Sequence, residues 1–449
     1  MIPFAIGAIA VLLQGPDEVL ARYQLDGKPA VVTRSDVAIE MGLDLCHKDV
    51  GRQAAEVLVD SEITRREAER LKLMPTDAEV RAFWDQLKAQ LRAAGRDPAN
   101  FAAVRNSTES EWLRDLALQL AQERLVRRAL DLDAGEAVSG DMLRLWLAEQ
   151  RKVHTVVDDR SQLAPGIAAR VDGRDLPILE LGLLLLRTSE DGERERYIRQ
   201  VAFLASIERE AEKLDVLADD AAIEAAITAR RRDVARDPRY RGLTFEQLLE
   251  TQGLSVELLR QRRVFRAKVL QEQITARLHP DAELRRELAA DRDGVVAEVG
   301  ARRRLGIVFR RALEEPNALV PNDFAAAAAS LERVKQRLEL ERFEMVARIE
   351  TDDPAGKESG GDTGWLQRAS DRLPEVVLAA AFAATAGEVV GPLRGPDGCY
   401  LVKVLDVEPD LTDDQLVERL RVLRGEQVGQ QILERADIRL GDGSGKDGR

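Results

Sequence analysis

The sequence is poor in the residues that carry metal and redox chemistry. Its 449 residues include two cysteines, Cys46 and Cys399, and three histidines, His47, His154 and His279. The cysteines are too far apart in sequence for a CxxC motif and too few for a disulfide framework, so we interpret both as small apolar fillers. The histidines are equally scattered, and the adjacent Cys46 and His47 would not face the same way on a helix. We therefore expect no zinc or haem site and no cofactor.

Aromatic residues and excess positive charge are also lacking. Aromatics make up 4% of the chain and hydrophobic residues 45%, so the cores must be built from Leu, Val, Ile and Ala on amphipathic helices. The formal net charge is −13, which argues against a nucleic-acid partner because neutralising phosphates requires a basic surface. The length indicates roughly two to four domains.

The N-terminus carries a short apolar run with no charge before Asp17. Residues 2–13 (IPFAIGAIAVLL) are too few to span a bilayer, which takes about 20 residues. They resemble the apolar core of a secretory signal that lacks the usual basic residues in front of it. The alternatives are a buried terminal segment, or a start methionine assigned too far downstream. We expect residues 1–20 to be a signal segment of a protein exported to the periplasm or cell envelope. Any membrane association would be loose and confined to this end, and residues 441–449 form a flexible tail by composition.

Two stretches of the chain, residues 21–158 and 164–292, resemble each other. Asp26-Gly27 is echoed by Asp172-Gly173, each between short apolar runs, which predicts a small hairpin in each stretch. The segment EAERLKL at 67–73 is echoed by EAEKLDV at 210–216. The pattern indicates a duplicated unit.

Each unit should continue as several amphipathic helices. Thr76 and Asp219 occupy equivalent places ahead of apolar-periodic runs and are predicted helix N-caps. No catalytic pattern is visible in either unit. They are either ordinary helical bundles or bundles whose exposed apolar groove holds an unfolded client or a partner helix.

After His279 the pattern changes to a mixed one. We predict a strand at 303–309, a long helix at 322–349, a glycine-permitted turn near 359–366, a helix at 374–384 and strands at 387–393 and 398–404. This order gives a small domain with a mostly antiparallel sheet. The predicted fold class is therefore mainly α with a C-terminal α+β domain.

The segments TDDP, SGGDTGW, GEVVGP and DGCYLVKV occur in an order that resembles the parvulin (PpiC, rotamase) family. The resemblance covers residues 295–408, and the two helical units before it resemble the chaperone regions of SurA- and PrsA-like foldases. It implies a closing helix and short strand at 411–440. It also implies peptidyl-prolyl cis-trans isomerase activity on unfolded or proline-containing polypeptide clients.

The resemblance further implies a site with two histidines and a nearby Cys or Asp. The acidic position falls on Asp353, with Asp352 as the alternative. Neither histidine is present, because residues 305–306 are Leu-Gly and the second position holds Tyr400. The apolar walls of the site, which are as consistent with plain domain core, would come from four residues: Leu366, Leu373, Val376 or its neighbour Val377, and Phe382.

Three functions stay open at this point. The domain is an isomerase in which the Tyr400 hydroxyl replaces an imidazole, because a pocket without histidine still desolvates the amide. Alternatively, it is a retired rotamase kept as a peptide-binding module in a holdase chaperone. A third class is a helical-repeat scaffold with no affinity for unfolded chains.

Overall fold

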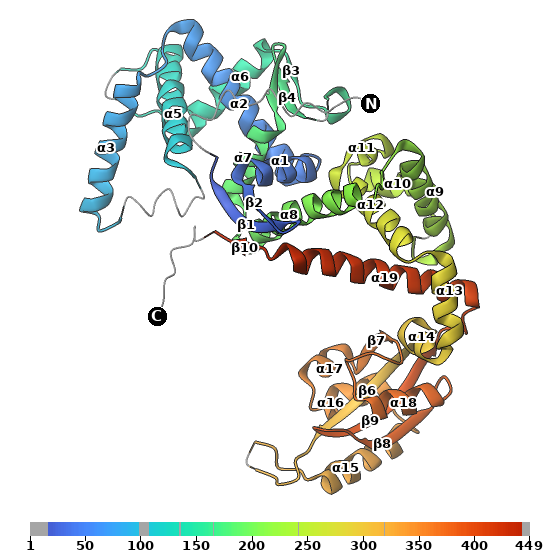
Figure 1. The fold of residues 1–449 in the computed structure, drawn as a ribbon. Helices are drawn as coiled ribbons and strands as arrows, with labels where there is room; N and C mark the ends of the chain where they lie inside the picture. Colours follow the sequence, from blue (N-terminus) through green and yellow to red (C-terminus); the bar gives the residue numbers. More distant parts are fainter. Residues whose placement is uncertain are drawn as a thin grey trace. The chain divides into compact units, whose positions relative to one another are not determined.

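The computed structural model of the chain describes residues 17–97, 107–133, 136–164, 166–240, 242–317 and 319–441. The apolar run at 2–13 and residues 442–449 of the predicted tail lie outside these residues. Two compact units are present: Met1–Gln273 together with Gly429–Arg449, and Ile274–Val428. The first is mainly helical with two small sheets, and the second contains a larger sheet (Figure 1). The predicted fold class is confirmed, whereas the predicted limits of the individual domains stay a prediction.

The first hairpin joins β1 (Val19–Leu25) and β2 (Lys28–Thr33) through the predicted turn. Asp26 and Gly27 have φ values of 58° and 70°, the pair of positive angles that matches a two-residue loop to the twist of its strands. The helices that follow are α1 (Arg34–Leu45), α2 (Asp49–Leu71), α3 (Asp77–Ala93), α5 (Glu109–Leu130) and α6 (Gly140–Val153).

The second hairpin, β4 (Ile167–Val171) and β5 (Arg174–Pro177), repeats this geometry with φ values of 45° at Asp172 and 81° at Gly173. It leads into α7 (Ile178–Thr188), α8 (Asp191–Lys213), α9 (Asp220–Arg236), α10 (Phe245–Thr251), α11 (Val256–Gln261) and α12 (Arg263–Leu278). The first unit thus has two halves, one beginning with each hairpin. The first three helices after the hairpin have 12, 23 and 17 residues in the first half and 11, 23 and 17 in the second. Thr76 and Asp219 are the N-caps of α3 and α9, as predicted.

Each hairpin turn docks on the second helix of the other half. Asp26 forms an ion pair with Arg209 of α8, and Asp172 forms one with Arg66 of α2, both at 3.4 Å. Arg66 and Arg209 directly precede the two segments whose sequences echo each other. The two ion pairs are therefore equivalent contacts of a duplicated unit whose halves exchange partners.

The two halves share one core, because α1 and α7 cross in close contact (Figure 1). A Cβ atom added at Gly182 of α7 would lie 2.9 Å from the Cα of Ala38 and still closer to its carbonyl group. One added at Gly42 of α1 would lie 2.6 Å from the carbonyl oxygen of Ile178. Glycine at both places lets the two helix backbones touch.

A third strand completes each small sheet. β3 (Val156–Val157), which follows α6, pairs with β4 of the second hairpin. β10 (Arg439–Leu440), which follows α19 (Asp413–Ala436), pairs with β1 of the first hairpin. The helix and short strand predicted at the end of the chain are thus present.

The second unit is built around a four-stranded antiparallel sheet in the order β7-β6-β9-β8. Its strands are β6 (Arg303–Arg311), β7 (Asp362–Leu366), β8 (Val389–Arg394) and β9 (Gly398–Val407). Its helices are α15 (Phe324–Arg337), α16 (Phe343–Glu350), α17 (Pro354–Ser359) and α18 (Glu375–Ala383). Ahead of the sheet, α13 (Asp281–Ala290) and α14 (Arg292–Val299) share a small core with the first turns of α19.

Side chains alternate between the two faces of this sheet, as they must along a strand. Leu305, Ile307 and Phe309 of β6 pack in one cluster with residues of α18. Val308, between them, packs in a second cluster with Leu331 of α15 and residues of α16. The sheet therefore has a separate core on each face.

The single helix predicted at 322–349 is wrong, since the chain forms α15 and α16 with a break at 338–342. The Ala/Leu/Glu pattern runs through the break, but Leu340 is 94% exposed there. The break turns Phe343 onto the sheet, where its ring covers Gly306, at which a Cβ would lie 2.5 Å from the ring. The glycine-rich segment after it, predicted as a turn only, forms the end of α17 and β7.

A group of charged residues fixes the end of β9. The Glu408 carboxylate accepts hydrogen bonds from the backbone N–H of Arg302 at 2.9 Å and from Arg419 of α19 at 2.7 Å. Burial acts to raise the pKa of Glu408, but the hydrogen bonds from the two arginines outweigh it and hold the pKa at about 2.

Candidate functional site

Asp353 lies at the start of α17, where its carboxylate caps the helix. It accepts hydrogen bonds from the backbone N–H groups of Ala355 at 3.2 Å and Gly356 at 2.9 Å. Pro354 follows at the first helical position, which needs no backbone donor. The sequence Asp-Pro thus folds locally as a helix start, and capping accounts for both carboxylate oxygens.

Asp352, the alternative acidic residue, is held against β6. Its carboxylate accepts from the backbone N–H of Arg311 at 2.9 Å and pairs with Arg310 at 3.0 Å. Its own N–H donates to the carbonyl of Phe309 at 2.8 Å. These bonds anchor Asp352 to the strand, whereas the Asp353 carboxylate bonds only within its own helix start.

Tyr400 is 7% exposed, and its hydroxyl donates to Asp397 Oδ1 at 2.6 Å. Its ring lies 4.8 Å, centroid to centroid, from the ring of Phe309 at an angle of 39°. A Cβ at Gly395 would lie 2.6 Å from the Tyr400 ring, so the β8–β9 loop passes directly over it. The Tyr400 ring is therefore packed between the Phe309 ring of the neighbouring strand and the β8–β9 loop.

Burial, followed by the hydrogen bond to Asp397, raises the pKa of Tyr400 well above its ordinary value, and the charge of Asp353 adds to the effect. The phenol consequently keeps its proton at neutral pH and acts as a hydrogen-bond donor, not as a base. Asp353, predicted from the sequence to share a site with Tyr400, thus lies near enough for its negative charge to disfavour loss of the Tyr400 proton.

The predicted apolar walls divide into two groups. Leu366, Leu373 and Phe382 all contribute to the cluster that contains Tyr400, on the α18 face of the sheet. Val376 is 45% exposed, whereas its neighbour Val377 is fully buried in that cluster. The structure thus gathers Tyr400 with three of the four proposed walls and leaves Val376 towards solvent.

Sequence reasoning missed Asp397, which holds the Tyr400 hydroxyl. It occupies the Asp-Gly turn that joins β8 to β9, and such a turn signal carries no functional information by itself. Only its position three residues before Tyr400, across a tight turn, could have suggested that the two side chains meet.

The part of the sequence that forms this group contains no imidazole, since no histidine follows His279. The position at which the first histidine of the resemblance would open β6 is filled by Leu305, which is fully buried. Within the described ranges, no three His, Cys, Asp or Glu side chains come together as metal ligands. None of the helices in those ranges is long and apolar enough to cross a membrane.

Residues 319–415 match the family model of the PPIC-type PPIASE domain. This part of the chain is a PPIC-type parvulin rotamase domain. The match covers α15 to β9 and begins after β6, although β6 forms the middle of the same sheet.

The chain also has SurA- and PrsA-like relatives. It is 28% identical over 228 residues to the chaperone SurA of Chromohalobacter salexigens, which covers 50% of this chain and 48% of that protein. It is 30% identical over 126 residues to the foldase protein PrsA of Bacillus subtilis, covering 26% of this chain and 42% of that protein. The chain thus spans about half the length of the relatives that it matches.

Solved structures of this group resemble parts of the chain with low overall scores. A PpiC-type peptidyl-prolyl cis-trans isomerase domain is 25% identical, covers 25% of this chain and 94% of its own, and gives a TM-score of 0.21. PrsA from Bacillus anthracis is 14% identical over 52% of this chain and 94% of its own, with a TM-score of 0.25. A Campylobacter jejuni structure comes from a study of PEB4 and the periplasmic protein Cj1289 as SurA-like chaperones. It is 17% identical, covers 68% of this chain and 97% of its own, and gives a TM-score of 0.21.

Proposed function

We propose that this protein is a folding factor for exported polypeptides, in which the helical unit holds unfolded clients and the rotamase domain binds proline-containing segments with a degenerate active site. The observation that carries the proposal is the rotamase domain at 319–415 in a chain without a histidine after His279. The SurA- and PrsA-like relatives support the folding role.

The chemistry of the site favours binding over fast catalysis. Rotation about the X-Pro bond must overcome a barrier of about 18–20 kcal/mol, which a rotamase lowers by desolvating and twisting the amide. Leu373 and Phe382, which are only half-buried at the edge of the apolar cluster, would contact the proline ring. The Tyr400 hydroxyl, however, already donates its proton to Asp397. We therefore expect the domain to bind X-Pro segments and to accelerate their isomerisation weakly or not at all.

Peptide binding tests the site directly with the full chain. Fluorescence anisotropy would compare a labelled X-Pro peptide with the same peptide carrying alanine in place of proline. We expect tighter binding of the proline form and loss of that preference in Leu373→Ala. The control is Leu405→Ala, since Leu405 lies in the same domain, is 37% exposed and is outside the cluster. Equal binding of both peptides would contradict a proline-recognising site.

Client holding is tested by light scattering of an unfolded, aggregating protein at rising concentrations of this chain. Suppression at near-stoichiometric ratios supports a holdase, the reading in which the rotamase domain binds but does not catalyse. A chain that neither suppresses aggregation nor binds peptides would instead be a helical-repeat scaffold.

The location of the protein is part of the same proposal. The apolar run at 2–13 supports export to the periplasm or cell envelope. Expression of the full chain in a bacterium, followed by fractionation and N-terminal sequencing, would check it. Recovery of the intact chain in the cytoplasm would contradict export.

A further inference from the structure

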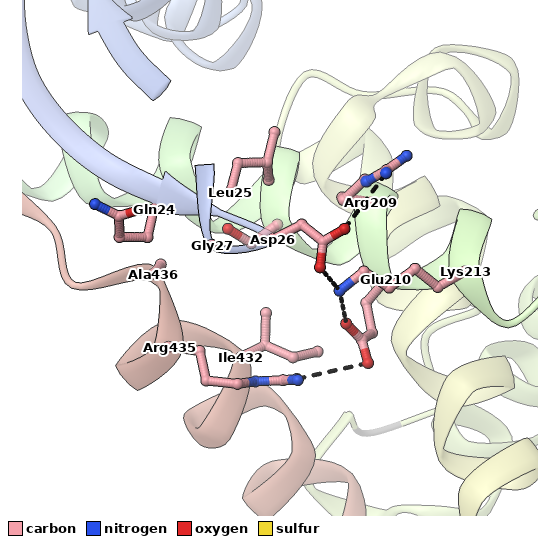
Figure 2. Close-up of a pocket in the computed structure, with 11 residues that line it drawn as sticks. Gln24, Leu25, Asp26, Gly27, Arg209, Glu210, Lys213, Ile432, Arg435 and Ala436 are labelled. Carbon is pink, nitrogen blue, oxygen red and sulfur yellow. Dashed lines mark hydrogen bonds and ion pairs between the residues drawn. The ribbon is translucent and has the colours of Figure 1, made fainter. Parts of the chain in front are cut away.

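A cavity of about 290 Å³ lies beside the turn of the first hairpin, within the first unit (Figure 2). Its walls are residues 24–27 of the hairpin, the last turns of α8 and the last turn of α19. This volume is just below the range of about 300–1,000 Å³ typical of ligand pockets, and it suits a few residues of extended chain rather than a helix.

The second hairpin shows what occupies the equivalent position in the other half. There β3 pairs with β4 up to Val171, the residue before the turn. Thr155, just ahead of β3, donates its backbone N–H to the Asp172 carboxylate at 2.8 Å and accepts from the Asp172 N–H at 2.8 Å. An extended stretch of the chain itself therefore fills the space beside this turn.

Beside the first turn that space is open. α19 stays helical as far as Ala436, and β10 pairs with β1 only at Ala21 and Arg22. The end of β1, with Gln24 and Leu25, consequently has no third strand among the described residues, and the cavity adjoins it. The duplicated fold offers here an unfilled place for a short extended segment.

The charges around the cavity indicate the chemistry of such a segment. The Lys213 ammonium bridges Asp26 at 2.5 Å and Glu210 at 3.3 Å, and Arg209 pairs with Asp26 at 3.4 Å. Arg435 of α19 reaches Glu210 only at 3.6 Å, and its side chain is 59% exposed (Figure 2). The cavity walls thus carry three cations and two carboxylates, and Arg209 also pairs with Glu212, outside the walls, at 2.8 Å. Arg435 is the most exposed of the three cations and has the longest ion pair, so it is the one able to turn to a ligand.

We propose that this cavity binds an extended polypeptide segment that bears a carboxylate. The segment runs along the open end of β1, and its carboxylate pairs with Arg435 and Lys213. This inference rests on the proposed function, because it names a class of client. The carboxylate belongs either to the C-terminus of the client or to an Asp or Glu side chain.

The test uses the full chain and one proline-free fluorescent hexapeptide in three forms: with a free C-terminus, amidated, and amidated with one internal glutamate. We expect one or both carboxylate forms to bind about fivefold tighter than the neutral amide, the size of a partly exposed ion pair. Arg435→Gln should abolish this preference. Arg439→Gln is the matched control, because Arg439 is 77% exposed, lies outside the cavity walls and pairs with Asp437.

Preference for the free C-terminus alone identifies chain ends as ligands, and preference for both forms identifies acidic side chains as well. Equal affinity for all three peptides, or an unchanged preference in Arg435→Gln, would overturn the inference. If the wild-type chain still suppresses client aggregation in that case, the proposed function stands without it. If the wild type suppresses no aggregation and binds no peptide, both fail together.

Discussion

The crossing of α1 and α7 makes a specific prediction about Gly182. In an ordinary helix interior, Gly→Ala stabilises by about 0.8–1.0 kcal/mol, because alanine has the better helix propensity. At Gly182 the new Cβ would lie 2.9 Å from the Cα of Ala38 and overlap its carbonyl group. The neighbour is backbone, so the two helices must move apart within the shared core. Overpacking costs about 1–3 kcal/mol, and because the overlapping atoms are backbone we expect the upper part of that range, about 2–3 kcal/mol.

We therefore expect Gly182→Ala to lower the free energy of unfolding by about 1–2 kcal/mol after the gain in helix propensity. The matched control is Gly192→Ala in the first turn of α8, where an added Cβ meets nothing within 4 Å and should be neutral or stabilising. Urea unfolding followed by tryptophan fluorescence measures the difference, since Trp84, Trp112 and Trp146 lie in this unit. A Gly182→Ala protein as stable as the wild type would refute the close crossing and with it the shared core.

Other predictions concern the second unit. In the folded state the pKa of Glu408 is about 2, against an ordinary value of 4.5. The stability that its carboxylate provides is therefore complete above pH 4.5 and is lost as the pH falls towards 2. Glu408→Gln should flatten this part of a curve of unfolding free energy against pH. Asp353→Ala should cost about 1 kcal/mol through the lost helix cap, whereas Asp353→Ser should restore most of it in the same thermal melt. Gly306→Ala should destabilise by about 1–3 kcal/mol, since the new methyl meets the Phe343 ring, and Gly306→Ala combined with Phe343→Leu should recover part of the loss.

Features encoded by a few neighbouring residues could be predicted from the sequence. The two Asp-Gly hairpins and the caps at Thr76 and Asp219 depend on local backbone preferences and occur as expected. The break between α15 and α16 could not be predicted, because the contact of Phe343 with Gly306 of a distant strand, which accompanies it, is not visible in the local sequence. The exchange of ion pairs between the two halves was equally hidden, since charged residues make up 33% of the chain and any pairing looks plausible.

The arrangement of the candidate site residues was predictable to a similar depth. The position of Tyr400 followed from the order of segments, and the structure places it with Leu366, Leu373 and Phe382. The sequence did not fix the rotation of α18, a helix that is apolar nearly all round, and so could not choose between Val376 and Val377. The bond from Tyr400 to Asp397 depends on a turn whose geometry the sequence does not reveal.

We propose above all that the rotamase domain, which contains no histidine, recognises X-Pro segments while contributing little catalysis. NMR exchange spectroscopy on a set of X-Pro peptides, with catalytic amounts of the full chain, measures the cis-trans interconversion rate directly. We expect rates close to those of the free peptides, together with peptide line broadening that is lost in Leu373→Ala. Strong acceleration that disappears in Tyr400→Phe would contradict it and make the protein a histidine-free isomerase.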